Sequence, residues 1–233
     1  MLGPIVNTAA IIVCSLAGSF LLKNIPSRIE EIVRKAIGFF VIYAGIKGAL
    51  DNQRVLLMLL SLTGGAVIGE LINIDGLMNR FGAWAERRLG MGGSGEQRSF
   101  SRAFISASIL YCTGSLIIVG SLQSGLTGNH DLLFMKSVLD GVASLVFAAS
   151  MGIGVAFSAI PLFICEAGIV LLSSAVKDFL NPEAIREMSA VGSLLVAAIG
   201  FNFLGMIEIK VANFIPAIFI PLVYITIEGL LKA

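Results

Sequence analysis

Residues 125–161 read GLTGNHDLLFMKSVLDGVASLVFAASMGIGVAFSAIP, and this stretch places the charges of Lys136 and Asp140 inside an otherwise apolar run. Because the two residues are four apart, their side chains lie on one face of a helix, within pairing distance. Charged groups in a bilayer are costly and usually face a protein interior or a water-filled cavity. The pair is therefore a candidate functional site. In the alternative interpretation, Lys136 lies at headgroup level and only anchors the helix, with Asp140 as its counter-charge.

The whole chain has the composition of an integral membrane protein. Its 233 residues are 57% hydrophobic and 13% charged, and its mean hydropathy is +0.94, which lies outside the usual range of soluble domains. One membrane-spanning helix takes roughly 20 residues. We therefore expect an all-α bundle of about seven or eight transmembrane helices that forms a single domain over 1–233. The net charge of +1 gives no indication of a nucleic-acid partner.

Apolar runs and turn signals predict where the helices begin and end. Two apolar runs almost touch at Gly152–Pro161, so the chain must bend sharply there. Asn181 followed by Pro182 is typical of the start of a helix. The expected spans are residues 5–22, 37–50, 55–72, 103–122, 133–156, 160–176, 189–206 and 211–230.

The distribution of positive charge predicts the orientation of the chain. Lysine and arginine are more frequent in the loops after the first and third expected spans than in the others, with Arg28 in the first and Arg87 in the third. Positive residues favour cytoplasmic loops, so we predict that both termini lie outside. The third loop also carries Leu77, Phe81 and Trp84 at helical spacing, which predicts an amphipathic helix on the membrane surface.

The first three and the last three spans resemble each other at a separation of 155 to 158 residues. Gly45 matches Gly200 at this separation, and Glu70 matches Glu228. Because equivalent spans are an odd number of spans apart, the two copies would be inverted, as they are in many secondary transporters. The predicted repeats cover 1–73 and 159–231, with 101–157 between them.

Polar residues near helix interruptions are the candidate substrate-binding residues. Pro4, Pro161 and Pro216 would interrupt the hydrogen bonding of their helices, and backbone groups freed in this way persist only beside protein or a water-filled cavity. Helix ends at that depth also direct their dipoles at whatever fills the cavity. We expect such side chains to line one central cavity with Lys136 and Asp140. The candidates are Asn7, Lys136, Asp140, Ser158, Glu166, Asn202 and Asn213.

Glu70 is a further candidate, near the end of the third expected span. It follows Gly65 and Gly69, whose GxxxG spacing allows close contact between helices. Two interpretations stay open for this carboxylate. It is either an interfacial group or a coupling residue that binds an ion during transport.

The sequence carries none of the usual signatures of an enzyme, such as HExxH, GxSxG, a Walker A loop or a dinucleotide fingerprint. Cys14, Cys112 and Cys165 lie far apart in apolar runs, without metal-ligand spacing. The one histidine, His130, is expected to lie in a solvated loop. We therefore predict no enzymatic activity, no catalytic residues, no metal site and no cofactor.

Short motifs are spread over the whole chain: Gly3-Pro4 with Asn7, Gly69-Glu70, Gly125-Leu126-Thr127-Gly128, Lys136-Ser137 with Asp140, the Ser150–Pro161 bend, Ser189-Ala190-Val191-Gly192, and Asn213 with Pro216-Ala217. Together they resemble a family of bacterial multi-pass membrane proteins called domain of unknown function 554, the YqgA- and YdfK-like proteins. The resemblance implies a location in the bacterial cytoplasmic membrane and a loosely described role in transport. It implies no substrate.

The leading functional hypothesis is a secondary transporter of a small polar or ionic solute across the bacterial cytoplasmic (inner) membrane. A channel is the main alternative, in which the same polar residues would line a continuous water-filled path. A third hypothesis is a structural or regulatory membrane protein whose polar residues serve only helix packing. The expected partners are membrane lipid, a small solute or ion and, in a homo-oligomer, a second copy of the chain.

Overall fold

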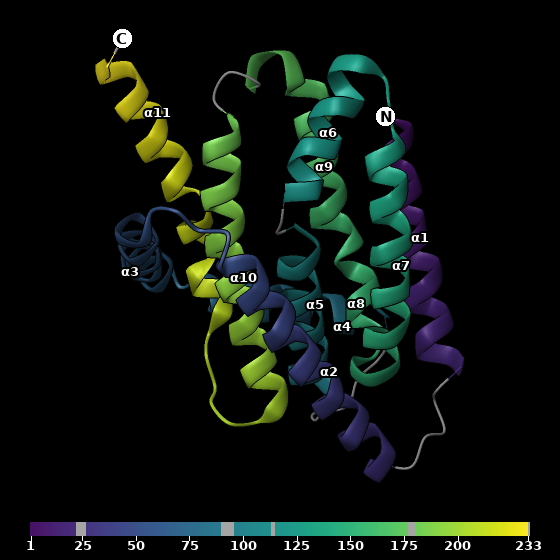
Figure 1. The fold of residues 1–233 in the computed structure, drawn as a ribbon. Coiled ribbons are helices and arrows are strands. Elements are labelled where there is room, and N and C mark those ends of the chain that lie inside the picture. Colours follow the sequence, from purple (N-terminus) through teal and green to yellow (C-terminus); the bar gives the residue numbers. More distant parts are fainter. Residues whose placement is uncertain (22–26, 90–95, 113–114, 177–179, 233) are drawn as a thin grey trace.

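The computed structural model describes residues 1–21, 27–89, 96–112, 115–176 and 180–232, and this part of the chain consists of helices and short loops, without a strand (Figure 1). The predicted all-α class is confirmed. In chain order the elements are α1 (Leu2–Leu21), α2 (Ser27–Ala49), α3 (Val55–Ile72), α4 (Ile74–Leu89), α5 (Glu96–Cys112), α6 (Ser115–Thr127), α7 (Asp131–Met151), α8 (Gly154–Phe157), α9 (Ala159–Val176), α10 (Pro182–Leu204), the 3-10 helix η1 (Val211–Ile218) and α11 (Ile220–Lys232).

Several of these elements, alone or joined to the next one, are long and apolar enough to cross a membrane. Over the described residues there are six such spans, and the bent pair α5 and α6 would make a seventh. The multi-pass class is therefore confirmed, with six or seven candidate spans where the sequence predicts seven or eight. The difference lies in α2, whose first half carries several charges such as Arg28, Glu31 and Lys35. The six spans are Leu2–Phe20, Val55–Ile72, Asp131–Met151, Gly154–Ala175, Pro182–Leu204 and Val211–Leu231.

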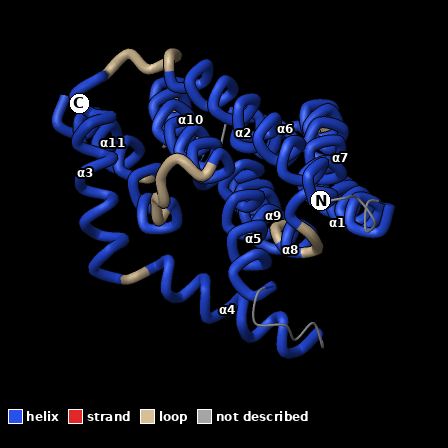
Figure 2. Tube along the Cα trace, turned by 90° about the horizontal axis from the view of Figure 1, so that it is seen from below, coloured by secondary structure: helices blue, strands red, loops and turns tan. Residues whose placement is uncertain are grey.

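The bundle is built from pairs of helices that pack along each other. α1 packs along α7, α2 along α10, and α6 along α9 (Figures 1 and 2). Glycines allow two of these pairs to approach closely: a Cβ at Gly18 would collide with the carbonyl of Leu145, and a Cβ at Gly45 with the backbone of Ala197. Both chain ends lie at the same end of the molecule (Figure 1).

The third expected span has the predicted bounds, but it does not run parallel to the other long helices. In Figure 1, α3 is seen nearly end-on, whereas α1, α7 and α10 run up the picture, and Figure 2 shows α3 in profile. Its GxxxG face contacts η1, because a Cβ at Gly65 would collide with Ala217 and a Cβ at Gly69 with the carbonyl of Asn213. The close helix contact expected from this spacing is therefore made with the start of the last span.

Local sequence explains three boundaries between helices. α7 ends at Gly152, which adopts a left-handed φ of +82°, and the short α8 leads into α9 at the predicted bend. α10 begins after Asn181, whose side chain accepts a hydrogen bond from the N–H of Ala184 at 2.8 Å, with Pro182 in the first turn. The last span is interrupted because Pro216 lies inside η1, before α11 begins.

The amphipathic helix expected around Trp84 is α4. Leu77 and Trp84 are both exposed on it, at 46% and 56%, whereas the side chain of Phe81 lies outside the described residues. α4 packs against α5, which begins at Glu96, earlier than the expected span at 103.

The predicted inverted repeat is not confirmed. α2 and α10 meet antiparallel, and the glycines matched in the sequence mark their contact: Gly45 approaches Ala197, and Gly200 lies so close to α2 that a Cβ would be 2.8 Å from the nitrogen of Ile42. Both contacts join residues whose separation in the chain is close to the 155 residues between Gly45 and Gly200. However, any antiparallel pair makes reciprocal contacts, so the repeat stays a prediction.

Candidate functional site

Four polar side chains named from the sequence meet inside the bundle. Asn7 comes from α1, Lys136 and Asp140 from α7, and Glu166 from α9. α1 packs along α7 and also contacts α9, so these three helices bring together residues from the start and the middle of the chain. We call these four residues the central cluster.

Asn7 connects the two carboxylates of the central cluster. Its Nδ2 donates to Asp140 Oδ2 at 3.1 Å and to Glu166 Oε1 at 2.7 Å. The ammonium of Lys136 forms an ion pair with the same Asp140 oxygen. Asp140 is thus held by a cation and an amide, while Glu166 is held by the amide alone.

The central cluster is closed to its surroundings. Asn7 and Glu166 are fully buried, and Lys136 and Asp140 are exposed by 4% and 9%. Lys136 therefore faces the protein interior. This geometry matches the first of the two interpretations of the pair, although its functional role stays a prediction.

Two oxygen atoms of the central cluster have no partner. Asn7 Oδ1 and Glu166 Oε2 are buried and accept no hydrogen bond from any residue that the structure describes. Most buried polar groups in proteins are hydrogen-bonded, and exceptions call for an explanation. The cluster also contains two carboxylates but one ammonium, so it carries one negative charge in excess when all three groups are ionised.

A buried tyrosine extends the polar region from α7 to α5. Tyr111 is 1% exposed, and Ser144 Oγ donates to its hydroxyl at 2.8 Å. Ser144 lies one turn of α7 beyond Asp140. Neither residue was among the sequence candidates, although the hydroxyl-rich segment from Ser106 to Ser115 was a visible signal for α5.

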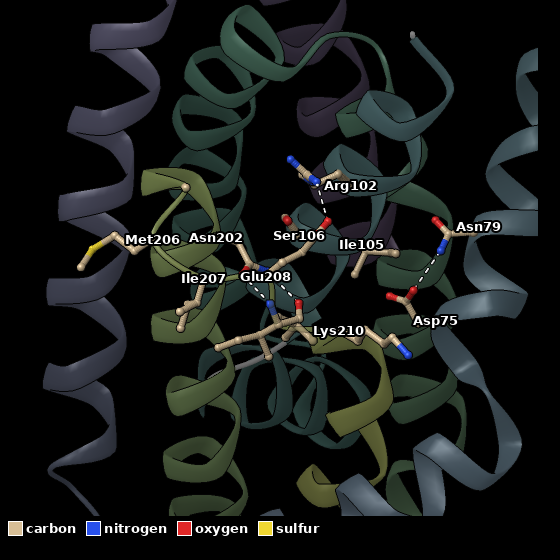
Figure 3. A pocket seen from close by; sticks show the side chains of 13 residues that line it. Asp75, Asn79, Arg102, Ile105, Ser106, Asn202, Met206, Ile207, Glu208 and Lys210 are labelled. Atoms are coloured by element: carbon tan, nitrogen blue, oxygen red, sulfur yellow. Dashed lines mark hydrogen bonds and ion pairs between the residues drawn. The ribbon is translucent and has the colours of Figure 1, made fainter. Parts of the chain in front are cut away.

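A larger polar pocket lies between α5, α4 and the loop that joins α10 to η1. It has a volume of about 710 Å³ and contains the cations Arg102 and Lys210 and the carboxylates Asp75 and Glu208 (Figure 3). Arg102 forms an ion pair with Glu208 at 3.3 Å, and the Asp75 carboxylate accepts from Asn79 at 2.9 Å (Figure 3). We call this the loop pocket.

Asn202 lines the loop pocket and not the central cluster. Its amide binds the backbone of Ile209 in both directions, donating to the carbonyl and accepting from the N–H at 2.8 Å each (Figure 3). The chain turns between these two residues at Gly205, which has a φ of +70°. In this structure Asn202 therefore holds the loop.

Asn213 and Glu70 form a separate site between α3 and η1. Asn213 Nδ2 donates to Glu70 Oε2 at 2.5 Å, and its Oδ1 accepts from the N–H of Asp75 at 2.7 Å. Lys210 forms an ion pair with Glu70 at 3.2 Å, and both side chains are more than half exposed. This position matches the interfacial interpretation of Glu70, and its coupling role stays a prediction.

Ser158 is fully buried at the bend before α9, but its hydroxyl donates to the carbonyl of Val155 at 2.6 Å. This bond satisfies a backbone group near the end of α8. Of the seven substrate-binding candidates, four thus meet in the central cluster, and Ser158, Asn202 and Asn213 make their contacts elsewhere.

A second buried carboxylate, Glu187 on α10, was not among the sequence candidates. It is 1% exposed and accepts from the N–H of Gln53 at 3.1 Å, from Arg186 at 3.3 Å and from the amide of Asn52. The loop between α2 and α3 is therefore held against the first turn of α10. Its sequence signal was weak, because a carboxylate near a helix start is common.

Arg54 holds the same loop from its other side. It forms ion pairs with Glu183 at 2.6 Å and with Glu228, and its side chain is 30% exposed. The hydrogen bond to Glu228 is the largest cause that raises the pKa of Arg54 above its ordinary value. The guanidinium therefore stays charged at any physiological pH.

The loop pocket approaches the central cluster through α5. Ser106 lines both this pocket and a small internal cavity beside Phe147 and Phe203. The two rings contact each other edge-on, with their centroids 6.1 Å apart. Beyond them along α7 lie Ser144 and then Asp140, so the aromatic pair separates the pocket from the cluster.

Fold and site together define a class of protein: a multi-pass helical membrane protein with a charged cluster enclosed by its helices. The chain belongs to the family described as Protein of unknown function (DUF554), whose model matches residues 2–226. The predicted family resemblance is therefore confirmed.

Two relatives are similar over almost their whole length. The chain is 30% identical over 233 residues to the uncharacterized membrane protein YdfK of Bacillus subtilis (strain 168), covering 97% of this chain and 96% of the relative. It is 27% identical over 219 residues to the uncharacterized protein YqgA of Escherichia coli (strain K12), covering 94% and 93%. No solved structure matches the chain. Neither name gives a substrate.

Proposed function

We propose that the protein is a secondary transporter of a small polar or ionic solute across the bacterial cytoplasmic membrane. The observation that carries this proposal is the central cluster, in which three spanning helices place an ammonium, two carboxylates and an amide in a closed interior site. Ionisable groups within membrane spans commonly mark the pathway of a solute or ion.

The energetics of the central cluster favour a functional origin. Helix packing alone can be achieved with small and apolar residues, as Gly18 and Gly45 illustrate. Replacing a buried ion pair by well-packed apolar groups is often neutral or stabilising. A cluster with one charge in excess and two unpartnered oxygens is therefore a poor solution for stability alone.

The loop pocket supports a route from one side of the protein. It is open and polar, and its Ser106 edge also lines the small cavity beside Phe147 and Phe203, on the same helix α7 as Ser144 and Asp140. Arg102 and Lys210 line it, and the distribution of positive charge predicts that this side faces the cytoplasm.

The closed position of the central cluster inside the bundle favours a carrier over a channel. A channel needs a continuous water-filled path past its polar residues, whereas the residues of the central cluster are at most 9% exposed. A carrier alternates between states open to either side, and a closed site is a normal stage of that cycle.

Transport assays in liposomes test the proposal. The purified protein is reconstituted, and charge movement on a solid-supported membrane is recorded after rapid addition of panels of amino acids, organic acids, amines and inorganic ions. We expect one class of solute to give a saturable transient signal. Asp140→Asn should abolish it, while Asp131→Asn, an exposed carboxylate on the same helix, should retain it.

The alternatives give different results in the same assay. A sustained current that rises in proportion to solute concentration would favour the channel. A wild-type protein that is folded and correctly inserted, yet silent toward every panel, would favour the structural or regulatory role.

A further inference from the structure

We infer that the central cluster binds one monovalent cation, a proton or a sodium ion, at Glu166 and Asn7. This inference rests on the proposed function and names the ion of that same site. It assigns the coupling role to Glu166 in the interior and not to Glu70 at the interface.

The charges of the central cluster are unevenly distributed. Lys136 is paired with Asp140, so Glu166 is hydrogen-bonded to an amide and, among the described residues, makes no direct ion pair. The other titratable groups near it are the thiols of Cys165 and Cys112, and α6 and α8, which also pack on α9, contribute none. An uncompensated carboxylate in the membrane interior is costly, and one positive charge removes the excess.

The two unpartnered oxygens support the same site independently of charge. Glu166 Oε2 and Asn7 Oδ1 belong to side chains that are joined by a 2.7 Å hydrogen bond and are both fully buried. Both atoms are acceptors. A proton on Oε2 turns that oxygen into a donor, and a sodium ion would use carboxylate and amide oxygens as ligands, because hard cations prefer oxygen.

The charge also limits the ion to a single positive charge. A divalent cation would reverse the excess of one negative charge and leave the site positive. Within the described ranges, no group of three or more histidine, cysteine, aspartate or glutamate side chains is arranged to hold a metal ion. The site is therefore suited to a monovalent cation.

Thermal unfolding of the purified protein in detergent tests cation binding without any transport measurement. One series varies pH in sodium-free choline buffer, and the other varies sodium chloride against choline chloride at constant pH and ionic strength. A ligand that binds only the folded protein raises its Tm. We expect a shift of roughly 3 °C or more across one of the two series.

A proton and a sodium ion would change the Tm in different ways. For a proton, the Tm should fall as pH rises, because deprotonation of Glu166 restores the excess charge, and sodium should have no effect. For a sodium ion, the Tm should rise with sodium chloride, more strongly at higher pH, where the carboxylate is free to bind it.

Glu166→Gln is the decisive variant, because its neutral amide resembles the protonated acid. It should remove at least most of the cation-dependent shift, and Asp131→Asn, which changes an exposed carboxylate at the start of α7, should keep it. If Glu166→Gln retains the full dependence on both cations, the inference is wrong.

A labelling experiment on the wild type covers the case in which Glu166→Gln does not fold. Dicyclohexylcarbodiimide modifies protonated carboxyl groups in apolar surroundings, and mass spectrometry identifies the modified residue. We expect modification of Glu166 that decreases with rising pH or with added sodium. Modification that is absent at every pH, or insensitive to both cations, would overturn the inference.

These experiments test the cation site separately from the proposed transport of a solute. Cation-dependent stability without solute transport would keep the cation site and reject the transporter. Solute transport without any cation-dependent stability would keep the transporter and reject the site.

Discussion

Glu166 and Glu187 are equally buried, at 0% and 1% exposure, but their surroundings differ completely. Glu187 accepts hydrogen bonds from a backbone N–H, an amide and a guanidinium, so its charge is balanced and its oxygens are used. Glu166 accepts one bond from Asn7, and its second oxygen has no partner. Burial by itself therefore does not show whether the protein supplies a carboxylate with partners.

The difference also follows the position of each residue in the fold. Glu187 lies in the first turns of α10, where it holds the loop that carries Gln53. Glu166 lies within the span of α9, between helices, where no loop needs to be held. A carboxylate whose partners are supplied by the protein is expected to contribute to stability, whereas one that lacks a partner is expected to accept one from outside.

The largest effect is expected for Lys136→Met, which removes the only cation of the central cluster and leaves two carboxylates uncompensated. Breaking a buried pair in this way costs about 3–5 kcal/mol of unfolding free energy. Thermal unfolding in detergent measures it. The double variant Lys136→Met with Asp140→Asn should recover a large part of the loss, and equal, negligible effects of both variants would contradict a buried pair.

Glu187→Gln should destabilise the protein by about 2–4 kcal/mol, because its amide offers one acceptor to several donors and leaves Arg186 without its counter-charge. The loop between α2 and α3 should become more accessible to limited proteolysis near Gln53. Unchanged stability and proteolysis would show that this carboxylate is not structural.

Arg54→Gln should have a smaller effect, about 1 kcal/mol, although it breaks two ion pairs. The side chains of Arg54, Glu183 and Glu228 are 25–39% exposed, so solvent compensates for much of the loss. The difference in Tm between wild type and variant should shrink at high salt, since exposed pairs are screened. A salt-independent loss as large as that of Glu187→Gln would place these pairs with the buried ones.

The smallest effect is expected for Glu166→Gln, which should change the unfolding free energy by less than roughly 1 kcal/mol. Its carbonyl keeps an acceptor for the amide of Asn7, and the excess charge disappears. The matched comparison is Glu187→Gln, with the same chemical change at the same degree of burial. A loss at Glu166 as large as that at Glu187 would remove the distinction between the two carboxylates.

Much of the helical order could be predicted from the sequence, because long apolar runs leave few alternatives. The bounds of α3 agree with the expected span 55–72, and Asn181 starts α10 as its cap predicts. The direction of α3 could not be predicted, because it depends on the contact of Gly69 with Asn213. The bend between α5 and α6 could not be predicted either, because no proline marks it in the sequence.

The candidate site was predictable as far as polar residues are conspicuous in apolar runs. This signal found Asn7 and Glu166, which meet in the structure, but it also selected Asn202. A short amide near a helix end can bind a backbone as well as a solute, and its spacing does not distinguish these uses. Glu187 was missed because its partners come from a loop 134 residues away in the chain.

The contact of α2 with α10 through Gly45 and Gly200 has a consequence for biosynthesis. α2 leaves the ribosome long before α10 is made. Because its first half is charged, α2 is not among the helices that are apolar enough to cross a membrane alone. Its final placement should therefore wait for a partner made much later, so that the order of assembly differs from the order of synthesis. A cysteine introduced at Val41, which is 2% exposed in the folded protein, should react with a water-soluble thiol reagent in a chain truncated before Pro182 and be protected in the full-length chain.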